Sequence, residues 1–140
     1  MLFRSDFDND GDLDLFAGSR SIPQNYGLSP ASFILMNDGT GNFTDIAKTK
    51  NTDIANIGLV TSALWADVTG DKKNDLVIVG EWMAPRVFTF EKDHFVEIKT
   101  NLSDLFGWWQ TVAAADVADN KIIVAIPVNI SSSNSLPPAK

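Results

Sequence analysis

The sequence lacks cysteine altogether and contains a single histidine, His94. Without cysteine, a disulfide framework, a cysteine nucleophile and a thiolate zinc site are all excluded. A single histidine also excludes a zinc site with two imidazole ligands, and it leaves only one candidate base for a Ser-His-Asp triad. Because the side chains of these catalytic sites are missing or scarce, we expect a protein that is not an enzyme.

Positive charge is scarce as well, since 11 Lys and Arg stand against 18 Asp and Glu, for a net charge of -7. Without a basic patch to displace phosphate counterions, nucleic acid and anionic membrane surfaces are poor partners. No apolar run approaches the roughly 18 residues of a transmembrane helix. The start, MLFRSDFDND, turns acidic before the apolar core of a signal peptide could form. We expect no nucleic-acid binding, no membrane insertion and no export signal in this chain.

The sequence does contain internal repeats, within a length of 140 residues that suits one globular domain. Residues 6–15 align with residues 67–76, and residues 58–68 align with residues 107–117. The repeated unit therefore recurs at Asp6, Asp67 and Asp116.

Each unit has the pattern of several short strands. β-branched and aromatic residues fill runs that Gly, Asn and Asp interrupt, which is typical of antiparallel sheets. The expected strands are 13–17, 33–36, 42–46, 62–65, 76–79, 86–90 and 94–98, and a strand precedes each full acidic loop, which makes four strands in a unit. Four-stranded antiparallel sheets that recur in this way indicate an all-β fold, a partial β-propeller of about two and a half blades.

We place the partial propeller in residues 1–128, with repeats near 1–56, 57–105 and 106–128. An insert at 18–31, rich in Ser, Pro, Asn and Gly, lengthens the first repeat between its second and third strands. A last strand is expected at 122–128. The Ser- and Pro-rich tail at 129–140 is expected to be disordered.

The first acidic loop has the spacing of a calcium site. A loop that wraps a point ion turns every second side chain inward, and multi-carboxylate oxygen sites suit Ca²⁺ better than zinc or Mg²⁺. Gly11 allows the tight turn that such wrapping needs. Side-chain ligands are expected from Asp6, Asp8, Asp10 and Asp14, with the backbone carbonyl of Asp12 between them.

Two other interpretations compete with this one. In the first, the loop is a solvated acidic turn, although five like charges with only Arg4 nearby would then destabilise the chain. In the second, the loop begins an EF-hand, which requires a Glu at its twelfth position and flanking helices. That position holds Ala17 in the first unit and Ile78 in the second, both in strand-like runs, so the EF-hand fails.

The second acidic loop is a poorer match. Lys72 replaces the glycine and Lys73 takes the backbone-ligand position, which brings two positive charges toward the site. Weak Ca²⁺ binding and a metal-free turn both fit. The third loop keeps only Asp116 and Asp119 and is expected to be metal-free. The candidate ligands of the second loop are Asp67, Thr69, Asp71 and Asp75.

Three motifs together resemble the FG-GAP/VCBS repeats of integrin α-like propellers and related surface proteins. They are Asp-x-Asp-x-Asp-Gly-Asp-x-Asp-Leu at 6–15, the hairpin Met-Asn-Asp-Gly-Thr-Gly-Asn-Phe at 36–43, and Trp-Ala-Asp-Val-Thr-Gly-Asp at 65–71. The Phe-Gly-Gly-Ala-Pro element itself is absent. The resemblance covers residues 1 to about 120. It implies a ring of seven or a similar number of blades, Ca²⁺ in blade loops, and a binding or adhesion role outside the cell or at its surface. The ring would be completed by further blades of a longer chain or by self-association, and its ligand would be a protein or a glycan.

A rival function is the propeller portion of a polysaccharide hydrolase or lyase. It would need an acid and a base converging at one face, and neither Glu81 with Glu97 nor Glu81 with Asp104 shows a supporting spacing. The four tryptophans are expected to pack between blades, and a stacking platform for sugars or peptides is the alternative. They are Trp65, Trp82, Trp108 and Trp109.

Overall fold

The computed structural model describes residues 1–118 and 121–125. The tail predicted at 129–140, residues 119–120 of the third acidic loop and the end of the last predicted strand lie outside the described residues. No helix in the described part of the chain is long and apolar enough to cross a membrane.

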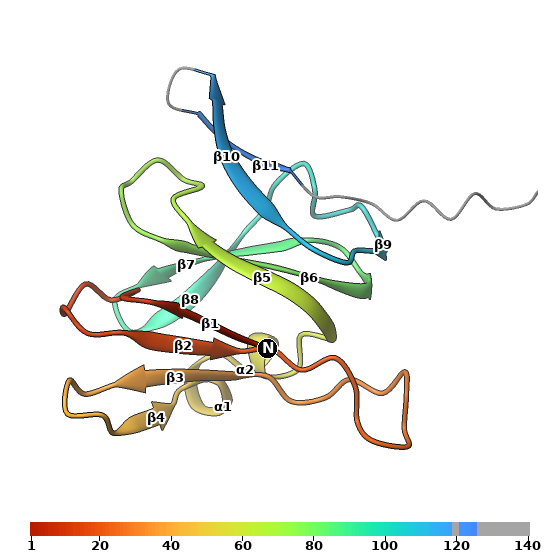
Figure 1. Ribbon diagram of the computed structural model, residues 1–140, viewed down its shortest axis with the longest axis horizontal. Helices are drawn as coiled ribbons and strands as arrows, with labels where there is room; N and C mark the ends of the chain where they lie inside the picture. The colour runs from red at the N-terminus through yellow and green to blue at the C-terminus, as the bar shows by residue number, and fades with distance from the viewer. Residues whose placement is uncertain (119–120, 126–140) are drawn as a thin grey trace, which may run out of the picture.

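Two antiparallel sheets form most of the molecule (Figure 1). The first has the strand order β1-β2-β3-β4, and the second has the order β5-β6-β7-β8. The strands of the first sheet are β1 (Leu2–Ser5), β2 (Asp14–Ala17), β3 (Phe33–Asn37) and β4 (Phe43–Asp45). Those of the second are β5 (Leu59–Ala66), β6 (Asp75–Met83), β7 (Arg86–Glu91) and β8 (His94–Ile98). The predicted all-β, partial propeller fold is confirmed, with consecutive strands adjacent in each sheet.

The second sheet also gains a fifth strand that was not expected. β9 (Gly107–Trp108) pairs with the end of β6, beyond the part of β6 that pairs with β7. The sequence alignment suggested that residues 107–108 open the next unit, but their backbone hydrogen bonds extend the second sheet. The chain then continues into the two-stranded sheet of β10 (Ala113–Ala118) and β11 (Lys121–Ala125).

Side chains that alternate along β6 pack into two separate cores. Leu76 and Ile78 belong to a cluster shared with the first sheet, whereas Val77 and Val79 belong to a second cluster with Trp109. Since successive strand residues point to opposite faces, β6 is buried on both sides. This explains its nearly continuous apolar sequence and places the second sheet in the middle of the molecule.

Two short helices connect the sheets, α1 (Ala47–Lys50) and α2 (Thr52–Ala55), and neither was expected from the sequence. Each has only four residues, too few to produce a helical period, so their formation depends on tertiary contacts. Asn51 lies between them and is 6% exposed; its Nδ2 donates to the carbonyl of Phe95 in β8 at 2.9 Å. This buried hydrogen bond ties the connection to the second sheet.

Candidate cation-binding loop

The first acidic loop joins β1 to β2, and its own side chains fold it. Asp8 accepts a hydrogen bond from the Asp10 N–H at 3.3 Å, and Asp10 accepts one from the Asp12 N–H at 3.1 Å. Asn9 and Gly11 take left-handed backbone conformations, with φ of 62° and 97°. Aspartates that accept from the backbone two residues on, together with Asn and Gly at positive φ, are the usual means of tight turning. The loop therefore curls because of its local sequence.

Three carboxylates meet inside this curl. Oxygens of Asp6, Asp8 and Asp14 all lie within 4.8 Å of one another, with Asp14 fully buried and the other two partly buried. Among the ion pairs of the described residues, none involves these three groups. Burial raises the pKa of Asp8, and it raises the pKa of Asp14 to about 6. The site therefore holds negative charge that no ion pair among the described residues offsets.

Two oxygens in the loop also lack hydrogen-bond partners. Oδ1 of Asp6 and Oδ1 of Asp12 are buried and unpaired, and burial raises the pKa of Asp12. Unpaired buried carboxylate oxygens are costly unless a cation or water satisfies them. Asp10, by contrast, is exposed and is not part of the group of three, and its Oδ1 instead accepts from the backbone. The donor set of the predicted site fits a hard cation.

The neighbouring hairpin positions Asp14, a role that the sequence analysis missed. The Asn37 N–H donates to Oδ1 of Asp14 at 2.9 Å, and the Asn37 side chain donates to the Leu13 carbonyl at 3.4 Å. The Asp38 carboxylate holds the hairpin turn by accepting hydrogen bonds from the hydroxyl and the backbone N–H of Thr40. These hydrogen bonds lower the pKa of Asp38. The signal was present in the Asn-Asp-Gly-Thr-Gly-Asn run, but the spacing alone did not show which loop the hairpin contacts.

Phe7 lies between Asp6 and Asp8 in the sequence, and its side chain points away from the carboxylates into the core. Its side chain is 1% exposed, and its N–H donates to Oδ2 of Asp14 at 3.3 Å. Its ring contacts three aromatic rings of the second sheet, with centroids at 4.8 Å for Phe90, 5.0 Å for Phe95 and 5.6 Å for Trp65. The alternation that turns the carboxylates inward therefore also directs Phe7 into the core between the sheets.

A hollow of about 500 Å³ opens beside the loop. Asp8 and Asp10 of the first acidic loop line it, together with Lys50, Lys73 and Lys92. It connects Asp8 to solvent, and an entry path is one requirement of a metal site.

Most carboxylate oxygens of the second acidic loop accept hydrogen bonds from the loop's own backbone. Both oxygens of Asp67 accept from the backbone, at 2.6 Å from Gly70, 3.1 Å from Asp71 and 2.8 Å from Lys72. Asp71 accepts from the Lys73 N–H at 2.9 Å. Thr69, which is exposed, donates its N–H to Asp75 at 3.0 Å.

Asp75 is the one carboxylate of the second loop that keeps an unpaired buried oxygen, its Oδ1. The structure brings no group of three carboxylates together at this loop, among the residues whose positions are described. Several candidate ligand oxygens of the second loop therefore already accept hydrogen bonds from its own backbone, and both interpretations of this loop stay predictions.

Two of the carboxylates considered for acid–base chemistry, Glu81 and Glu97, are held in ion pairs. Glu97 forms a two-point pair with Arg86 at 2.9 and 2.8 Å, and this pairing lowers the pKa of Glu97. Glu81 is 3% exposed and binds Arg20 and Tyr26. Burial alone would raise the pKa of Glu81, but these hydrogen bonds and the charge of Arg20 outweigh it and lower the pKa. A general acid needs the opposite shift.

The family model for FG-GAP-like repeats matches residues 6–78. The match begins at the first aspartate of the first acidic loop and continues through the second loop into β6. No match was found among curated proteins or among solved structures.

Proposed function

The chain belongs to the FG-GAP-like repeat family, and from that premise we propose that it is a calcium-binding β-propeller repeat module of an extracellular or cell-surface protein. Its role is binding or adhesion, and Ca²⁺ stabilises the first blade loop. The observation that carries the proposal is the group formed by Asp6, Asp8 and Asp14, which has no positive partner among the described residues and lies beside unpaired buried oxygens.

Asp6, Asp8 and Asp14 would hold the ion, which supplies the positive charge that the loop lacks. The residues around them keep this donor set in place. Asn37 fixes the carboxylate of Asp14, and Phe7 anchors the loop to the second sheet. Ca²⁺ binding would add its free energy to folding because the unfolded chain has no assembled site.

The role is proposed to be non-enzymatic. A polysaccharide hydrolase or lyase would need a carboxylic acid able to give up a proton near neutral pH, and the ion pairs of Glu81 and Glu97 act against this. The two-stranded sheet of β10 and β11 is smaller than the other two sheets. We expect further blades of a longer chain, or a second copy, to pair with its strands and complete the ring.

Calorimetric titration of the metal-stripped chain with Ca²⁺ tests the proposal, with thermal unfolding measured alongside. We expect saturable binding, and a stabilisation of about 3 kcal/mol when Ca²⁺ is a hundredfold above its Kd. This corresponds to a rise in Tm of roughly 10 °C. Asp8→Asn should abolish the rise without lowering the Tm of the metal-free chain, because it also removes a repelling charge.

Asp71→Asn in the second loop is the matched control, and the response to Ca²⁺ should survive it because Asp71 accepts a backbone hydrogen bond and faces solvent. The proposal fails if the folded chain binds no Ca²⁺, or if the Asp8 and Asp71 variants lose the response equally.

A further inference from the structure

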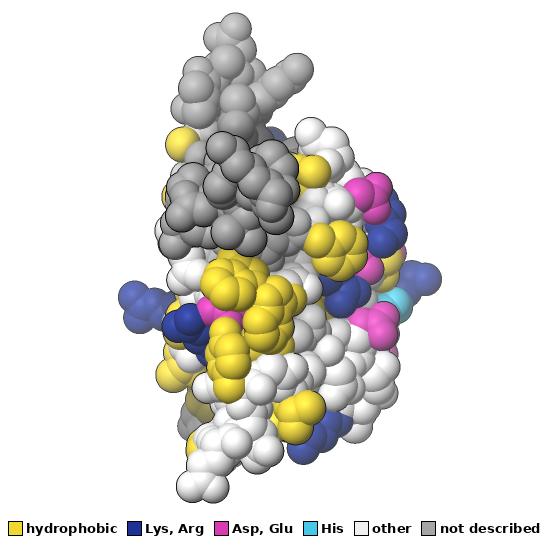
Figure 2. Space-filling view, turned by 90° about the vertical axis from the view of Figure 1, so that its right-hand side faces the viewer, with side chains coloured by type: hydrophobic (Ala, Val, Ile, Leu, Met, Phe, Trp, Pro, Cys, Tyr) yellow, Lys and Arg dark blue, Asp and Glu magenta, His cyan; other side chains and the backbone are white. Residues whose placement is uncertain are grey.

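Three exposed aromatic side chains lie at the opposite end of the strands from the acidic loops. The acidic loops precede β2 and β6, whereas Tyr26 lies in the long loop that follows β2, and Trp82 lies near the end of β6. Trp108 lies in β9, which pairs with that end of β6. Hydrophobic side chains gather on this side of the molecule, beside acidic and basic ones (Figure 2).

The three side chains form one contiguous surface. We call Tyr26, Trp82 and Trp108 together the aromatic platform. Tyr26 is 60% exposed, Trp82 51% and Trp108 49%. The ring centroids of Tyr26 and Trp82 are 5.6 Å apart with the ring planes at 62°, and those of Trp82 and Trp108 are 5.9 Å apart with the planes at 54°. The rings are therefore inclined to one another, and each offers its own face to a sugar unit. Of the four tryptophans expected to pack between blades, Trp109 is buried and Trp65 packs partly buried against the core, whereas Trp82 and Trp108 are exposed. The exposed pair fits the alternative interpretation, a stacking platform for sugars or peptides.

Trp82 is held in an unfavourable backbone conformation. Its φ is 57°, in the left-handed region, and the strand pairing is irregular between Glu81 and Met83 on either side of it. A bulky residue at positive φ is rare and strained, and such strain tends to persist where a side chain must be displayed for a function. Burial of the ring does not account for the strain, because half of the side chain faces solvent.

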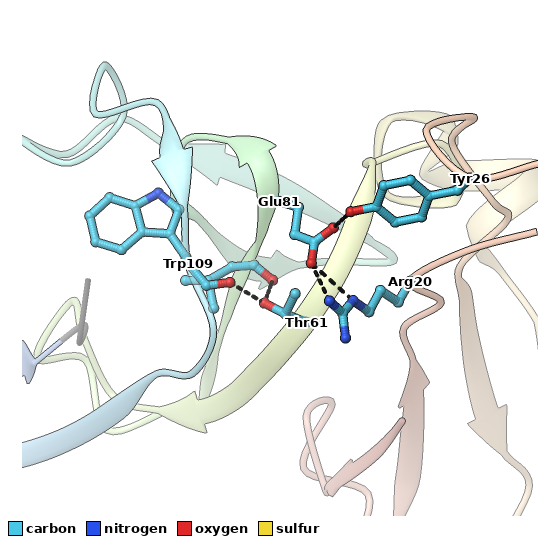
Figure 3. Close-up of polar contacts among 6 residues, drawn as sticks. Arg20, Tyr26, Thr61, Glu81 and Trp109 are labelled. Carbon is cyan, nitrogen blue, oxygen red and sulfur yellow. Dashed lines mark hydrogen bonds and ion pairs between the residues drawn. The ribbon is translucent and has the colours of Figure 1, made fainter. Parts of the chain in front are cut away.

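A buried carboxylate fixes the platform from beneath. Glu81, the neighbour of Trp82, is 3% exposed, and it binds the guanidinium of Arg20 and the hydroxyl of Tyr26 (Figure 3). Both partners come from the long loop of the first sheet. The hydrogen bonds therefore hold the Tyr26 ring against Trp82 and leave little freedom for it to turn away, which reduces the entropy lost when a ligand binds.

The size of the platform favours a small ligand. Aromatic side chains present about 150–250 Å² each, so three rings with about half of each exposed offer roughly 350 Å². A standard protein interface needs about 800 Å² from each partner. A flat ring of similar size that stacks on aromatic faces fits this area better than a second protein does.

The charge favours a neutral ligand. The net charge of -7 disfavours an anionic ligand, and beside the platform Arg20 and Glu81 are paired with each other, so neither offers a free opposite charge to an ionic ligand. A pyranose with equatorial hydroxyls has faces lined by C–H groups whose slight positive charge is attracted to the negative faces of aromatic rings. Its rim hydroxyls would meet the polar groups of Arg20 and Tyr26.

We propose that the aromatic platform is a binding site for neutral, equatorially hydroxylated pyranose sugars, such as a β-1,4-linked oligosaccharide. This site would supply the class of ligand for the binding role proposed above. The proposal depends on that proposed function only for the role of the chain as a binding module. It shares no residue with the candidate cation loop.

The test is a titration of the full chain with cellohexaose and with N-acetylchitohexaose, followed by calorimetry and tryptophan fluorescence, with Ca²⁺ and with a chelator. We expect saturable binding of at least one of the two sugars. Trp82→Gly and Trp108→Ala should each weaken it by about tenfold or more. Trp82→Gly should not lower the Tm much, because glycine relieves the strain at φ of 57°. A purely structural Trp82 would instead give a clear loss of Tm.

Phe106→Ala is the matched control, since Phe106 is a 76% exposed aromatic with no ring contact to the platform. The affinity for sugar should be unchanged in it. The proposal is overturned if a cooperatively melting chain binds neither sugar, or if Trp82→Gly binds as tightly as the parent chain. It is also overturned if Trp82→Gly converts a dimer into a monomer, because the platform would then be a self-association surface. Sugar binding without any Ca²⁺ binding would refute the cation proposal and leave this one standing.

Discussion

Replacement of Phe7 should reveal how strongly the first acidic loop supports the packing of the two sheets. Phe7→Ala removes a ring that is 1% exposed, and it leaves a cavity among Trp65, Phe90 and Phe95. Burial losses of this kind cost about 3–5 kcal/mol, a large part of the roughly 5–15 kcal/mol by which a domain is stable. Phe7→Leu keeps most of the volume but loses the ring contacts, so we expect about 1–2 kcal/mol.

Urea unfolding followed by tryptophan fluorescence measures both losses, and Trp65 is a suitable reporter because it contacts Phe7. The control is Phe43→Ala, since Phe43 is 44% exposed on β4 and its loss should change stability by no more than about 0.5 kcal/mol. If Phe7→Leu and Phe43→Ala prove equally stable, the loop does not anchor the sheets as argued. The Ca²⁺ affinity of Phe7→Leu should also fall, because the ring and the carboxylates share one loop.

Two further outcomes follow from the structure. In the metal-free chain the folded-state pKa of Asp14 is raised to about 6 from an ordinary value of 3.8, so the folded state binds more protons between these values. The stability of the metal-free chain should therefore fall as the pH rises from about 4 to about 7. Ca²⁺ should remove this trend because it favours the ionised form of Asp14. A Tm that rises with pH in the presence of chelator would contradict this prediction. Gly80→Ala would place a Cβ 2.2 Å from the carbonyl oxygen of Leu59. Because this neighbour is backbone and cannot move aside cheaply, we expect a loss of more than about 2 kcal/mol by chemical unfolding, and a variant of unchanged stability would refute the close approach of β5 to β6.

The sequence predicted a strand well where burial imposes a period of two, as in β2, whose residues are alternately buried and partly buried. Of the aspartates predicted to turn inward, Asp6, Asp8 and Asp14 lie together, whereas Asp10 is exposed and outside the group. The sequence did not predict α1 and α2, which are too short to show a period. It could not predict that Asn37 holds Asp14, because this hydrogen bond joins a loop to a separate hairpin.

Trp82 was misassigned for a related reason. Large aromatic residues are usually buried, and nothing in its neighbours indicates a left-handed backbone that turns the ring toward solvent. Its exposure depends on the irregular pairing with β9, a strand of two residues that no local pattern distinguishes from a turn.

The first acidic loop is not a portable motif. Its even positions, Asp6 and Asp8, face the candidate ion, while Phe7 between them occupies a socket built by another sheet. A nine-residue graft of the loop into a foreign scaffold would carry the carboxylates but would leave Phe7 without that socket. The exposed ring would then pack against other apolar groups, and this would move the carboxylates out of the positions that bind the ion. Successful transplantation would need the aromatic residues of the neighbouring blade as well, so the smallest transferable unit is a pair of blades.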